Sequence, residues 1–279
     1  MQFGPPVIAQ LNLTDTNGRC LVMGVLNVTP DSFSDGGRYL GVADALEQAS
    51  RMVGEGADIL DIGGESTRPG ASAVSAAEEL ERIIPVIERL RVEFDVPISV
   101  DTSKAEVMRA AVLAGATMIN DVCALQSPGS MDVAAELAVP VCLMHMLGEP
   151  RTMQDAPEYE DVVDDVCQFL QNRIDACLAA GISRARVIVD PGFGFGKTLA
   201  HNLALLRNLD RIAALGYPVL AGLSRKSMLG QILDRPVDKR LYGGLAMAIL
   251  ARQKGAAIIR VHDVAETVDA LRVLAAVSA

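Results

Sequence analysis

The segment Val187–Thr198 reads VIVDPGFGFGKT: a short apolar run ending on the acid Asp190, a Pro-Gly turn, glycines alternating with phenylalanines, and a closing Lys-Thr pair. β-Branched residues bounded by turn formers predict a buried strand that ends at Asp190. An ionised acid at the end of a strand, beside a glycine-rich turn, contributes little to packing and is suited to holding a ligand. The alternative is a glycine-rich connection whose acid merely caps the next helix.

A phosphate-binding loop fits this segment less well. The pattern GxxxxGK[ST] requires a glycine where this chain has Pro191. The carboxylate of Asp190 would also repel a phosphate. A ligand held at the end of this strand would therefore be of another kind.

Composition narrows the class of protein. The 279 residues, half of them apolar, are enough for one large α/β domain, and we expect a single domain over residues 1–279. No apolar stretch approaches the ~18 residues of a membrane span, and the start MQFGPPVIAQ lacks the features of a signal peptide. The five cysteines form no CxxC pair, which argues against a disulfide framework or a zinc site. We expect a cytoplasmic protein that does not act on a membrane.

The charge balance bears on the partner. A net charge of −10 argues against nucleic-acid binding, which requires a basic face. An anionic small molecule is still compatible with the sequence where positive side chains gather locally. The sequence therefore favours small-molecule substrates.

Short apolar strands alternate with amphipathic helices along the chain, which predicts a parallel sheet. Val7–Leu13 and Cys20–Leu26 flank the turn TDTNGR and suggest an N-terminal hairpin. The further strands are expected at Asp58–Ile62, Ile98–Val100, Thr117–Ile119, Val141–Met144, Val187–Val189, Val219–Leu223 and Ile258–Ile259. The helices are expected at Ala43–Gly54, Ala76–Phe94, Lys104–Ala114, Met131–Leu137, Tyr159–Ala180, Leu203–Leu215, Tyr242–Lys254 and Val264–Val277.

Eight strand–helix units in roughly 250 residues are typical of a (β/α)8 TIM barrel. An open, doubly wound sheet is the alternative, but it gathers its ligand contacts at one switch point. Here polar residues follow every strand: Asn27, Asp61, Asp101, Asn120, His145, Asp190, the run Ser224-Arg225-Lys226, and Arg260 with His262. Contacts that surround a centre favour the closed barrel, with the N-terminal hairpin closing the opposite end.

The polar residues at the strand ends fall into two chemical groups. Acids and amides would accept hydrogen bonds from a flat ligand with several N–H donors: Asp61, Asp101, Asn120 and Asp190. Cations would bind an anion such as a phosphate: Lys226, Arg260 and His262, with Arg68 and Arg225 on loops. Asn27 with the loop acids Asp31 and Asp35 offers the oxygen ligands that Mg²⁺ prefers. No triad order or activated cysteine suggests a protein nucleophile.

Individual residues of this set also have plainer interpretations. Asp101 can cap the following helix, and Asp61 can serve the barrel interior. His145 stands between two methionines, a setting that favours a packed histidine over a ligand. Arg225 can instead lie at the surface or support a site residue, because Lys226 lies on the other side of the chain. The functional hypothesis therefore depends on the whole ring of strand ends.

Long motifs make the chain recognisable. They are MGVLNVTPDSFSDGG (23–37), DIGGESTRPG (61–70), SVDTSK (99–104), IND (119–121), MHM (144–146), DPGFGFGK (190–197), GLSRKS (222–227) and RVHDV (260–264). With these motifs in this order, the chain resembles the dihydropteroate synthases of the folate pathway from Met23 to His262. The departures, Leu147 after MHM and Cys123 after IND-V, fall on no residue to which the resemblance assigns a role.

The resemblance implies a pterin-binding barrel that joins 6-hydroxymethyl-7,8-dihydropterin diphosphate to 4-aminobenzoate, giving 7,8-dihydropteroate and diphosphate. By position it implies a pterin site of Asp101, Asn120, Met144, Asp190 and Lys226, and a diphosphate site of Asn27, Arg260 and His262, with Mg²⁺ at Asn27. It implies an aminobenzoate site of Thr67, Arg68, Pro69, Phe195 and Ser224. The catalytic roles fall to Asp101, Asp190, Lys226, Asp35 and Arg68.

The chemistry of the residues agrees with this activity. A diphosphate becomes a good leaving group when Mg²⁺ and cations stabilise its developing charge. The positive charge that appears on the pterin methylene would lie near Asp101 and Asp190. Because the incoming aromatic amine is neutral at pH 7, no strong base is required. We therefore expect a dissociative, SN1-like path.

Two alternatives and one assembly state complete the expectations. A corrinoid-dependent methyltransferase of the same superfamily would use a methylated folate and release no diphosphate. A non-catalytic pterin-binding paralogue is the second alternative. The helices expected at Tyr242–Lys254 and Val264–Val277 carry apolar residues on more than one face, which favours a twofold dimer, as does the resemblance.

Overall fold

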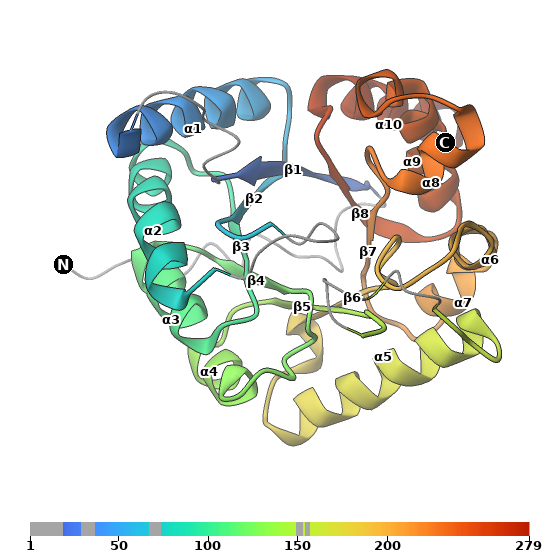
Figure 1. The fold of residues 1–279 in the computed structure, drawn as a ribbon, viewed down its shortest axis with the longest axis horizontal. Coiled ribbons are helices and arrows are strands. Elements are labelled where there is room, and N and C mark those ends of the chain that lie inside the picture. The colour runs from blue at the N-terminus through green and yellow to red at the C-terminus, as the bar shows by residue number, and fades with distance from the viewer. Residues whose placement is uncertain (1–18, 29–36, 67–73, 149–152, 154–156, 279) are drawn as a thin grey trace.

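Eight parallel strands close into a barrel in chain order (Figure 1). The computed structural model describes residues 19–28, 37–66, 74–148, 153 and 157–278. The strands are β1 (Leu21–Asn27), β2 (Ile59–Gly63), β3 (Ile98–Asp101), β4 (Met118–Asp121), β5 (Val141–Met144), β6 (Val187–Asp190), β7 (Val219–Gly222) and β8 (Ala256–Val261). β8 pairs in parallel with β1, which closes the cylinder. The predicted TIM barrel is confirmed.

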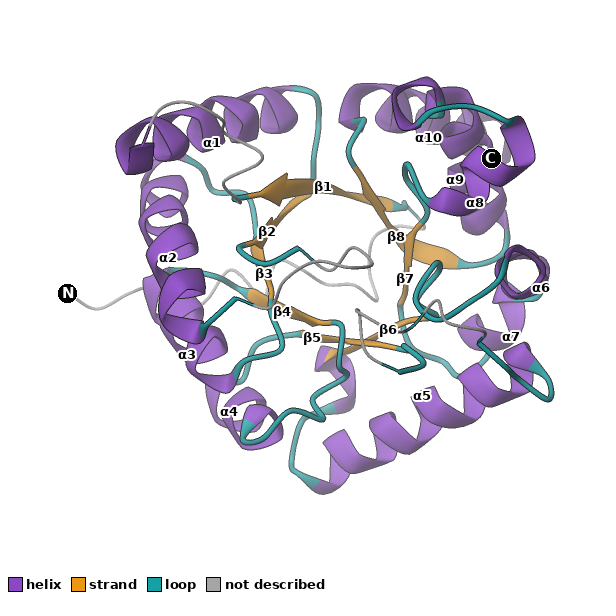
Figure 2. Ribbon diagram, viewed as in Figure 1, coloured by secondary structure: helices purple, strands orange, loops and turns teal. Residues whose placement is uncertain are grey.

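The helices surround the barrel as an outer ring (Figure 2). They are α1 (Gly37–Gly54), α2 (Ala76–Glu93), α3 (Ala105–Ala114), α4 (Ser130–Leu137), α5 (Val162–Ala179), α6 (Leu199–Arg207), α7 (Leu209–Ala213), α8 (Ser227–Leu233), α9 (Leu241–Gln253) and α10 (Val264–Ser278). None of the helices in the described ranges has the length and apolarity that a membrane crossing requires.

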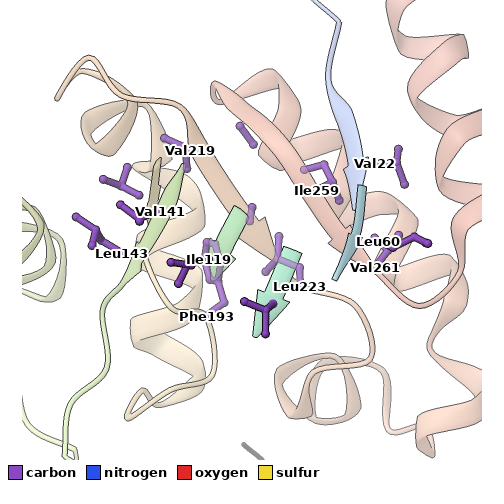
Figure 3. Close-up of a cluster of buried hydrophobic side chains, with 14 of the residues drawn as sticks. Val22, Leu60, Ile119, Val141, Leu143, Phe193, Val219, Leu223, Ile259 and Val261 are labelled. Carbon is purple, nitrogen blue, oxygen red and sulfur yellow. The ribbon is translucent and has the colours of Figure 1, made fainter. Parts of the chain in front are cut away.

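Side chains on each strand alternate between the helices and the barrel interior, because successive residues of a strand point to opposite faces. The outward positions join the helices in one large apolar cluster, which includes Val22, Leu60 and Val141 (Figure 3). The inward positions form a second, smaller apolar cluster: Leu21, Met23, Ile59, Met118, Cys142, Ile188, Leu220 and Ile258.

The inward positions change character toward the carboxyl ends of the strands. Two residues after Ile59 comes Asp61, two after Met118 comes Asn120, two after Ile188 comes Asp190, and two after Ile258 comes Arg260. The period of two keeps each of these polar side chains on the inner face of its strand. The barrel therefore has an apolar floor and a charged upper layer, which is where TIM-barrel enzymes place their active sites.

Several predicted elements differ from those observed. Cys20–Leu26 belongs to a barrel strand, β1, and the other half of the predicted hairpin lies outside the described residues. α1 begins at Gly37, six residues before the predicted start. The prediction began the helix too late because the many turn-forming residues of Thr29–Gly37 are typical of a loop. The helix predicted at Leu203–Leu215 is two helices, α6 and α7, which meet at Asn208.

α5 and α8 also differ from the sequence-based expectations. α5 begins at Val162 rather than at Tyr159, because the Asp161 carboxylate accepts hydrogen bonds from the amides of Val163 and Asp164 and caps the helix there. Tyr159 instead donates its hydroxyl hydrogen to the carbonyl of Gly196. α8 was not predicted; its seven residues are too few for a helical repeat to show in the sequence.

Glycines shape the loop that follows β6. Gly192, Gly194 and Gly196 all have positive φ, at 68°, 80° and 62°. A Cβ on Gly192 would lie 1.8 Å from the carbonyl oxygen of His145, and one on Gly196 would lie 2.5 Å from that of Leu147. The alternating glycines therefore let this loop press directly against the backbone that follows β5.

We expect Gly192→Ala to destabilise the fold by more than ~3 kcal/mol, since it combines left-handed strain with a backbone clash. Gly181→Ala is the matched control, because Gly181 also has positive φ, 86°, but nothing lies within 4 Å of its would-be Cβ. That control should lose only about 1–2 kcal/mol. The free energies of unfolding in urea test this. Equal losses in the two variants would contradict the close approach at His145.

Candidate active site

The guanidinium of Arg260 joins three strands at the carboxyl end of the barrel. Its Nε donates to Oδ2 of Asp61 at 2.6 Å, and one of its terminal nitrogens donates to Oδ2 of Asp101 at 2.8 Å. Arg260 comes from β8, Asp61 from β2 and Asp101 from β3. Charge-assisted bonds of this kind fix geometry as well as charge.

Asp61 is wholly buried and holds other residues rather than facing solvent. Besides Arg260, it accepts a hydrogen bond of 3.1 Å from the side-chain amide of Asn120. Its second oxygen, Oδ1, has no hydrogen-bond partner among the residues that the structure describes. Of the two interpretations of Asp61 from the sequence, service to the barrel interior is the one observed. Asp61 orients Arg260 and Asn120 from below.

Asp101 has an unusual electrostatic setting. Burial raises its pKa to about 7, nearby Asp61 adds to the rise, and the Arg260 guanidinium opposes it. A carboxylate in such a place gains from a ligand that brings positive charge or N–H donors. The alternative role of Asp101 as a helix cap is not observed, because the position before α3 is taken by Lys104 without a side-chain hydrogen bond.

The charges of Asp190, at the end of β6, and Lys226, which follows β7, interact with one another. Oδ1 of Asp190 accepts the amide hydrogen of Gly192 at 2.7 Å. Burial raises the pKa of Asp190 to about 6, and that amide and Lys226 oppose the rise. Burial and the Arg260 charge lower the pKa of Lys226 to about 8, against the pull of Asp190. Groups displaced toward neutrality in this way are frequent in ligand sites.

Lys226 also lies over an aromatic ring. Its ammonium nitrogen is 4.1 Å from the ring centroid of Phe195, a cation–π distance. Phe195 is predicted to contact aminobenzoate, and Lys226 to contact the pterin. The structure thus brings together two residues from the two predicted subsites.

Ser224 and His262 form the β7–β8 side of the layer. The hydroxyl oxygen of Ser224 lies 3.1 Å from Nδ1 of His262 and accepts the His262 amide hydrogen at 3.3 Å. Arg225, between Ser224 and Lys226, has φ of 59° and pairs with Asp263 at 2.5 Å. Arg225 is exposed and belongs to the surface, as one of its two interpretations held. Its neighbours instead contact site residues, Ser224 with His262 and Lys226 with Phe195.

The remaining predicted site residues divide between described and undescribed parts of the chain. Asn27 ends β1 with a half-buried side chain, and Met144 ends β5 and is buried. The roles predicted for Asp31, Asp35, Thr67, Arg68 and Pro69 concern residues that lie outside the described ranges. His145 is buried against the ring of Phe169 at 4.8 Å, as expected of a packed histidine.

Two lysines were missed from the sequence, the half-buried Lys104 and the buried Lys197. Lys104 donates to Glu65 and to the fully buried Glu79, both at 2.5 Å. Glu65 in turn accepts the amide hydrogen of Val74, across the segment 67–73. Lys197 is the second. Both lysines end a recognised motif, SVDTSK or DPGFGFGK, and that position was the available signal.

A metal ion would have few protein ligands here. Within the described ranges, no group of three or more His, Cys, Asp or Glu side chains could hold one. The amide oxygen of Asn27 lies 3.7 Å from the position of a Cβ on Gly63 and so borders the space that this glycine leaves open. One neutral oxygen ligand fits Mg²⁺, which usually keeps several waters and binds through substrate phosphates.

Comparison with known proteins places this site in a family. The family model described as "pterin binding enzyme" matches residues 23–262. A dihydropteroate synthase from Haemophilus influenzae is 56% identical over 263 residues, covering 92% of this chain and 96% of the relative. The chain belongs to the pterin-binding enzymes, as a dihydropteroate synthase family member. The sequence-based prediction of family and enzyme class is confirmed.

Solved structures of the family share the fold. The Xanthomonas albilineans dihydropteroate synthase with 4-aminobenzoic acid is 57% identical, with a TM-score of 0.89 and 94% of each chain covered. The same enzyme in complex with 7,8-dihydropteroate is 53% identical, with a TM-score of 0.85 and 94% of each chain covered. The family's barrel and this chain's barrel are therefore the same architecture.

The raised pKa of Asp190 predicts that Asp190→Asn stabilises the fold. The pKa of this carboxyl is ordinarily 3.8 and is about 6 in the folded protein, so its ionisation opposes folding above pH 6. The effect disappears at low pH, where the carboxyl is protonated in both the folded and the unfolded state. We expect a gain of about 3 kcal/mol in unfolding free energy at pH 8 that shrinks toward pH 4.

Urea unfolding across this pH range measures the effect. Asp95→Asn, at an exposed position between α2 and β3, is the control and should change stability little at any pH. A constant difference between Asp190→Asn and the native chain over the whole range would contradict the assigned electrostatics.

Proposed function

We propose that the chain joins 6-hydroxymethyl-7,8-dihydropterin diphosphate to 4-aminobenzoate with the charged layer at the carboxyl ends of its strands. The observation that carries this is the convergence of Asp101, Asn120, Asp190, Lys226 and Arg260 within motifs of the dihydropteroate synthases. The related Xanthomonas albilineans enzyme is solved with 4-aminobenzoic acid and with 7,8-dihydropteroate, one reactant and the product of this condensation.

The pterin ring is proposed to lie among the acids. It is flat and carries several N–H donors, which Asp190, Asp101 and the amide oxygen of Asn120 can accept. Lys226 would donate to an acceptor atom of the ring, and buried Met144 would pack on its face. A ligand that satisfies Asp190 and Asp101 also offsets the cost of their burial, which supports this placement.

The diphosphate is proposed to lie against Arg260, His262 and Asn27. A guanidinium has five N–H donors. Among the described residues, Arg260 uses one on Asp61 and one on Asp101, and its other N–H donors can serve an anion. Mg²⁺, held by the Asn27 oxygen and the phosphate oxygens, would supply further charge neutralisation on the leaving group.

The 4-aminobenzoate ring is proposed to lie near Phe195 and Ser224. Ser224 can donate its hydroxyl hydrogen to a carboxylate, and the half-buried Phe195 offers an aromatic edge. Thr67, Arg68 and Pro69 complete this site in the proposal, as does Asp35 in the catalytic set. Their assignment rests on the family motifs that they match.

The reaction then follows from charge. The bond between the pterin methylene carbon and the diphosphate oxygen breaks, and its electron pair leaves with the diphosphate beside Arg260. The methylene and ring become positive, which Asp101 and Asp190 stabilise as carboxylates. The lone pair of the aminobenzoate nitrogen forms the new C–N bond, and its proton leaves to solvent or diphosphate. We propose an SN1-like order for these steps.

Assembly as a twofold dimer is part of the proposal. Exposed apolar side chains gather on the last helices: Tyr242 on α9 is 81% exposed, and Val273 and Val277 on α10 are 66% and 81% exposed. A symmetric partner would cover them. Light scattering at micromolar concentration should give twice the chain mass, and a monomer would contradict the dimer.

We also propose that the protein acts in the cytoplasm, which agrees with its free cysteines. Fractionation of cells tests that placement.

The proposed activity is tested by one assay. The protein is mixed with the dihydropterin diphosphate, labelled 4-aminobenzoate and Mg²⁺, and labelled dihydropteroate and released diphosphate are measured. Equimolar formation of both products is expected. Methyl transfer from a methylated folate without diphosphate release would point instead to the methyltransferases of the superfamily.

Lys226→Met is expected to cut affinity for the dihydropterin substrate tens- to thousands-fold, because it removes one partner of a desolvated charged contact, worth about 2–5 kcal/mol. Lys254→Met is the control, since Lys254 is half-exposed and its ion pair among the described residues is with Asp210, at 3.5 Å. Titration calorimetry with the dihydropterin measures both variants. Unchanged affinity in Lys226→Met would remove this residue from the pterin site.

Excess chelator is expected to abolish turnover, because the leaving diphosphate would lose its neutralising ion. Asn27→Ala should raise the Mg²⁺ concentration that gives half the maximal rate. Asn172→Ala, on the exposed face of α5, should leave that concentration unchanged. Full turnover in excess chelator would contradict the requirement for Mg²⁺.

A further inference from the structure

Lys197 is a buried cation that no predicted role explains. Its side chain ends within a shell of acceptors: Nζ lies 2.9 Å from Nδ1 of His145, 3.3 Å from the His145 carbonyl oxygen, and 2.9 Å from the carbonyl oxygens of Gly192 and Phe195. The residue is 3% exposed. Within the described ranges, none of its hydrogen-bond partners is a carboxylate.

The shell identifies what Lys197 does chemically. An ammonium has three hydrogens and no acceptor, so all three are engaged by the four acceptors around it. Where Lys197 is an ammonium, His145 presents the lone pair of Nδ1 and carries its proton on Nε2. Burial, together with the Lys197 charge, keeps the histidine neutral by lowering its pKa to about 3. Nothing is left on Nζ for a phosphate, which excludes direct anion binding.

The two peptides held by Lys197 each position a residue of the proposed site. The carbonyl of Gly192 bonds to Lys197, and the amide of the same residue donates to the Asp190 carboxylate at 2.7 Å. The carbonyl of Phe195 bonds to Lys197, and its ring lies under the Lys226 ammonium. One ammonium thus restrains Asp190 and Phe195 at the same time.

The surroundings show how closely this loop is restrained. Gly192 lies against the His145 carbonyl, which no residue with a Cβ could do. The amide of Gly194 donates to Asn202 at 2.7 Å, and Asn202 donates to the carbonyls of Lys197 and Thr198. The Tyr159 hydroxyl donates to the carbonyl of Gly196, and Phe193 is buried in the apolar core. Lys197 connects the loop to His145, the residue that follows β5.

A purely apolar residue would fill this place at lower cost if only packing were needed. Burying a cation away from carboxylates opposes folding, and here burial lowers the pKa of Lys197 to about 7. Such a cost is retained where the geometry it imposes is used. The loop so held is the one that carries Asp190 and Phe195.

We propose that Lys197 is a positioning residue that holds Asp190 and Phe195 in register for the pterin and the aminobenzoate, an inference that rests on the proposed function of these two residues. Lys197 touches neither substrate. It acts through the peptides of Gly192 and Phe195. Removal of the Lys197 ammonium should therefore weaken the binding of both substrates, while removal of the Asp190 carboxylate or the Phe195 ring should weaken the binding of one.

Lys197→Met tests this, because it keeps the length and removes the three N–H donors. The affinity for the dihydropterin, by calorimetry, and the KM for aminobenzoate should each worsen about tenfold or more. Lys254→Met is the matched control and should change neither. Circular dichroism and thermal unfolding verify the fold. If Lys197→Met does not fold, Lys197→Gln, which keeps two N–H donors, is measured instead.

A double-mutant cycle separates positioning from general loosening. If Lys197 acts through Phe195, then adding Lys197→Met to Phe195→Leu should raise the KM for aminobenzoate little beyond Phe195→Leu alone. The same holds for dihydropterin affinity in an Asp190→Asn background. Additive losses in both backgrounds would show a merely structural lysine and overturn the proposal.

Two other results would also overturn it. One is unchanged affinity for both substrates in folded Lys197→Met. The other is a loss confined to kcat. Failure of the native chain to form dihydropteroate would instead refute the proposed function, and the calorimetric comparison of Lys197→Met with the native chain would still report on ligand positioning.

Discussion

The contact of Arg260 with Asp61 and Asp101 is the interaction on which the upper layer of the barrel depends. It connects β8, β2 and β3 where their side chains converge. Asp61 also accepts a hydrogen bond from Asn120, which adds β4 to the connected strands. Removing one partner from a buried ionic contact typically costs 3–5 kcal/mol, because the other charge is left unpaired. The Arg260 contact therefore offsets part of the cost of placing two carboxylates above the apolar floor of the barrel.

The buried charges of this layer are only partly compensated by one another, and this favours the binding of a ligand that compensates them. Asp101 and Asp190 have raised pKa values, and Lys226 has a lowered one, since burial disfavours each charge. A ligand with N–H donors for the acids and a diphosphate for the cations relieves all of them. The protein thereby stores, as electrostatic strain, part of the free energy with which it binds substrate.

The loop after β6 supplies the second constraint. Three glycines with positive φ allow it to lie on the backbone after β5, and buried Lys197 fixes its carbonyls. This loop carries Phe195 and, through the Gly192 amide, holds Asp190. The proposed pterin and aminobenzoate subsites would thus share one support, which agrees with a reaction whose main requirement is orientation.

Local pattern in the sequence determined the strands, most helices and the ring of polar residues at the strand ends, because side-chain alternation and turn chemistry act over a few residues. It also determined the family, through motifs matched in order. It placed α1, α5 and the split of α6 from α7 less well, since caps such as Asp161 and turn-rich starts compete with periodicity there.

Tertiary structure alone decided which polar residue holds which. Asp61 and Arg260 are far apart in the chain, and nothing near either residue predicts that the Asp61 carboxylate pairs with Arg260 rather than with a ligand. Lys197 looked like the end of a glycine-rich motif, and only the fold brings His145 to its ammonium. These pairings follow from barrel closure, which sets distances between strand ends that no local pattern contains.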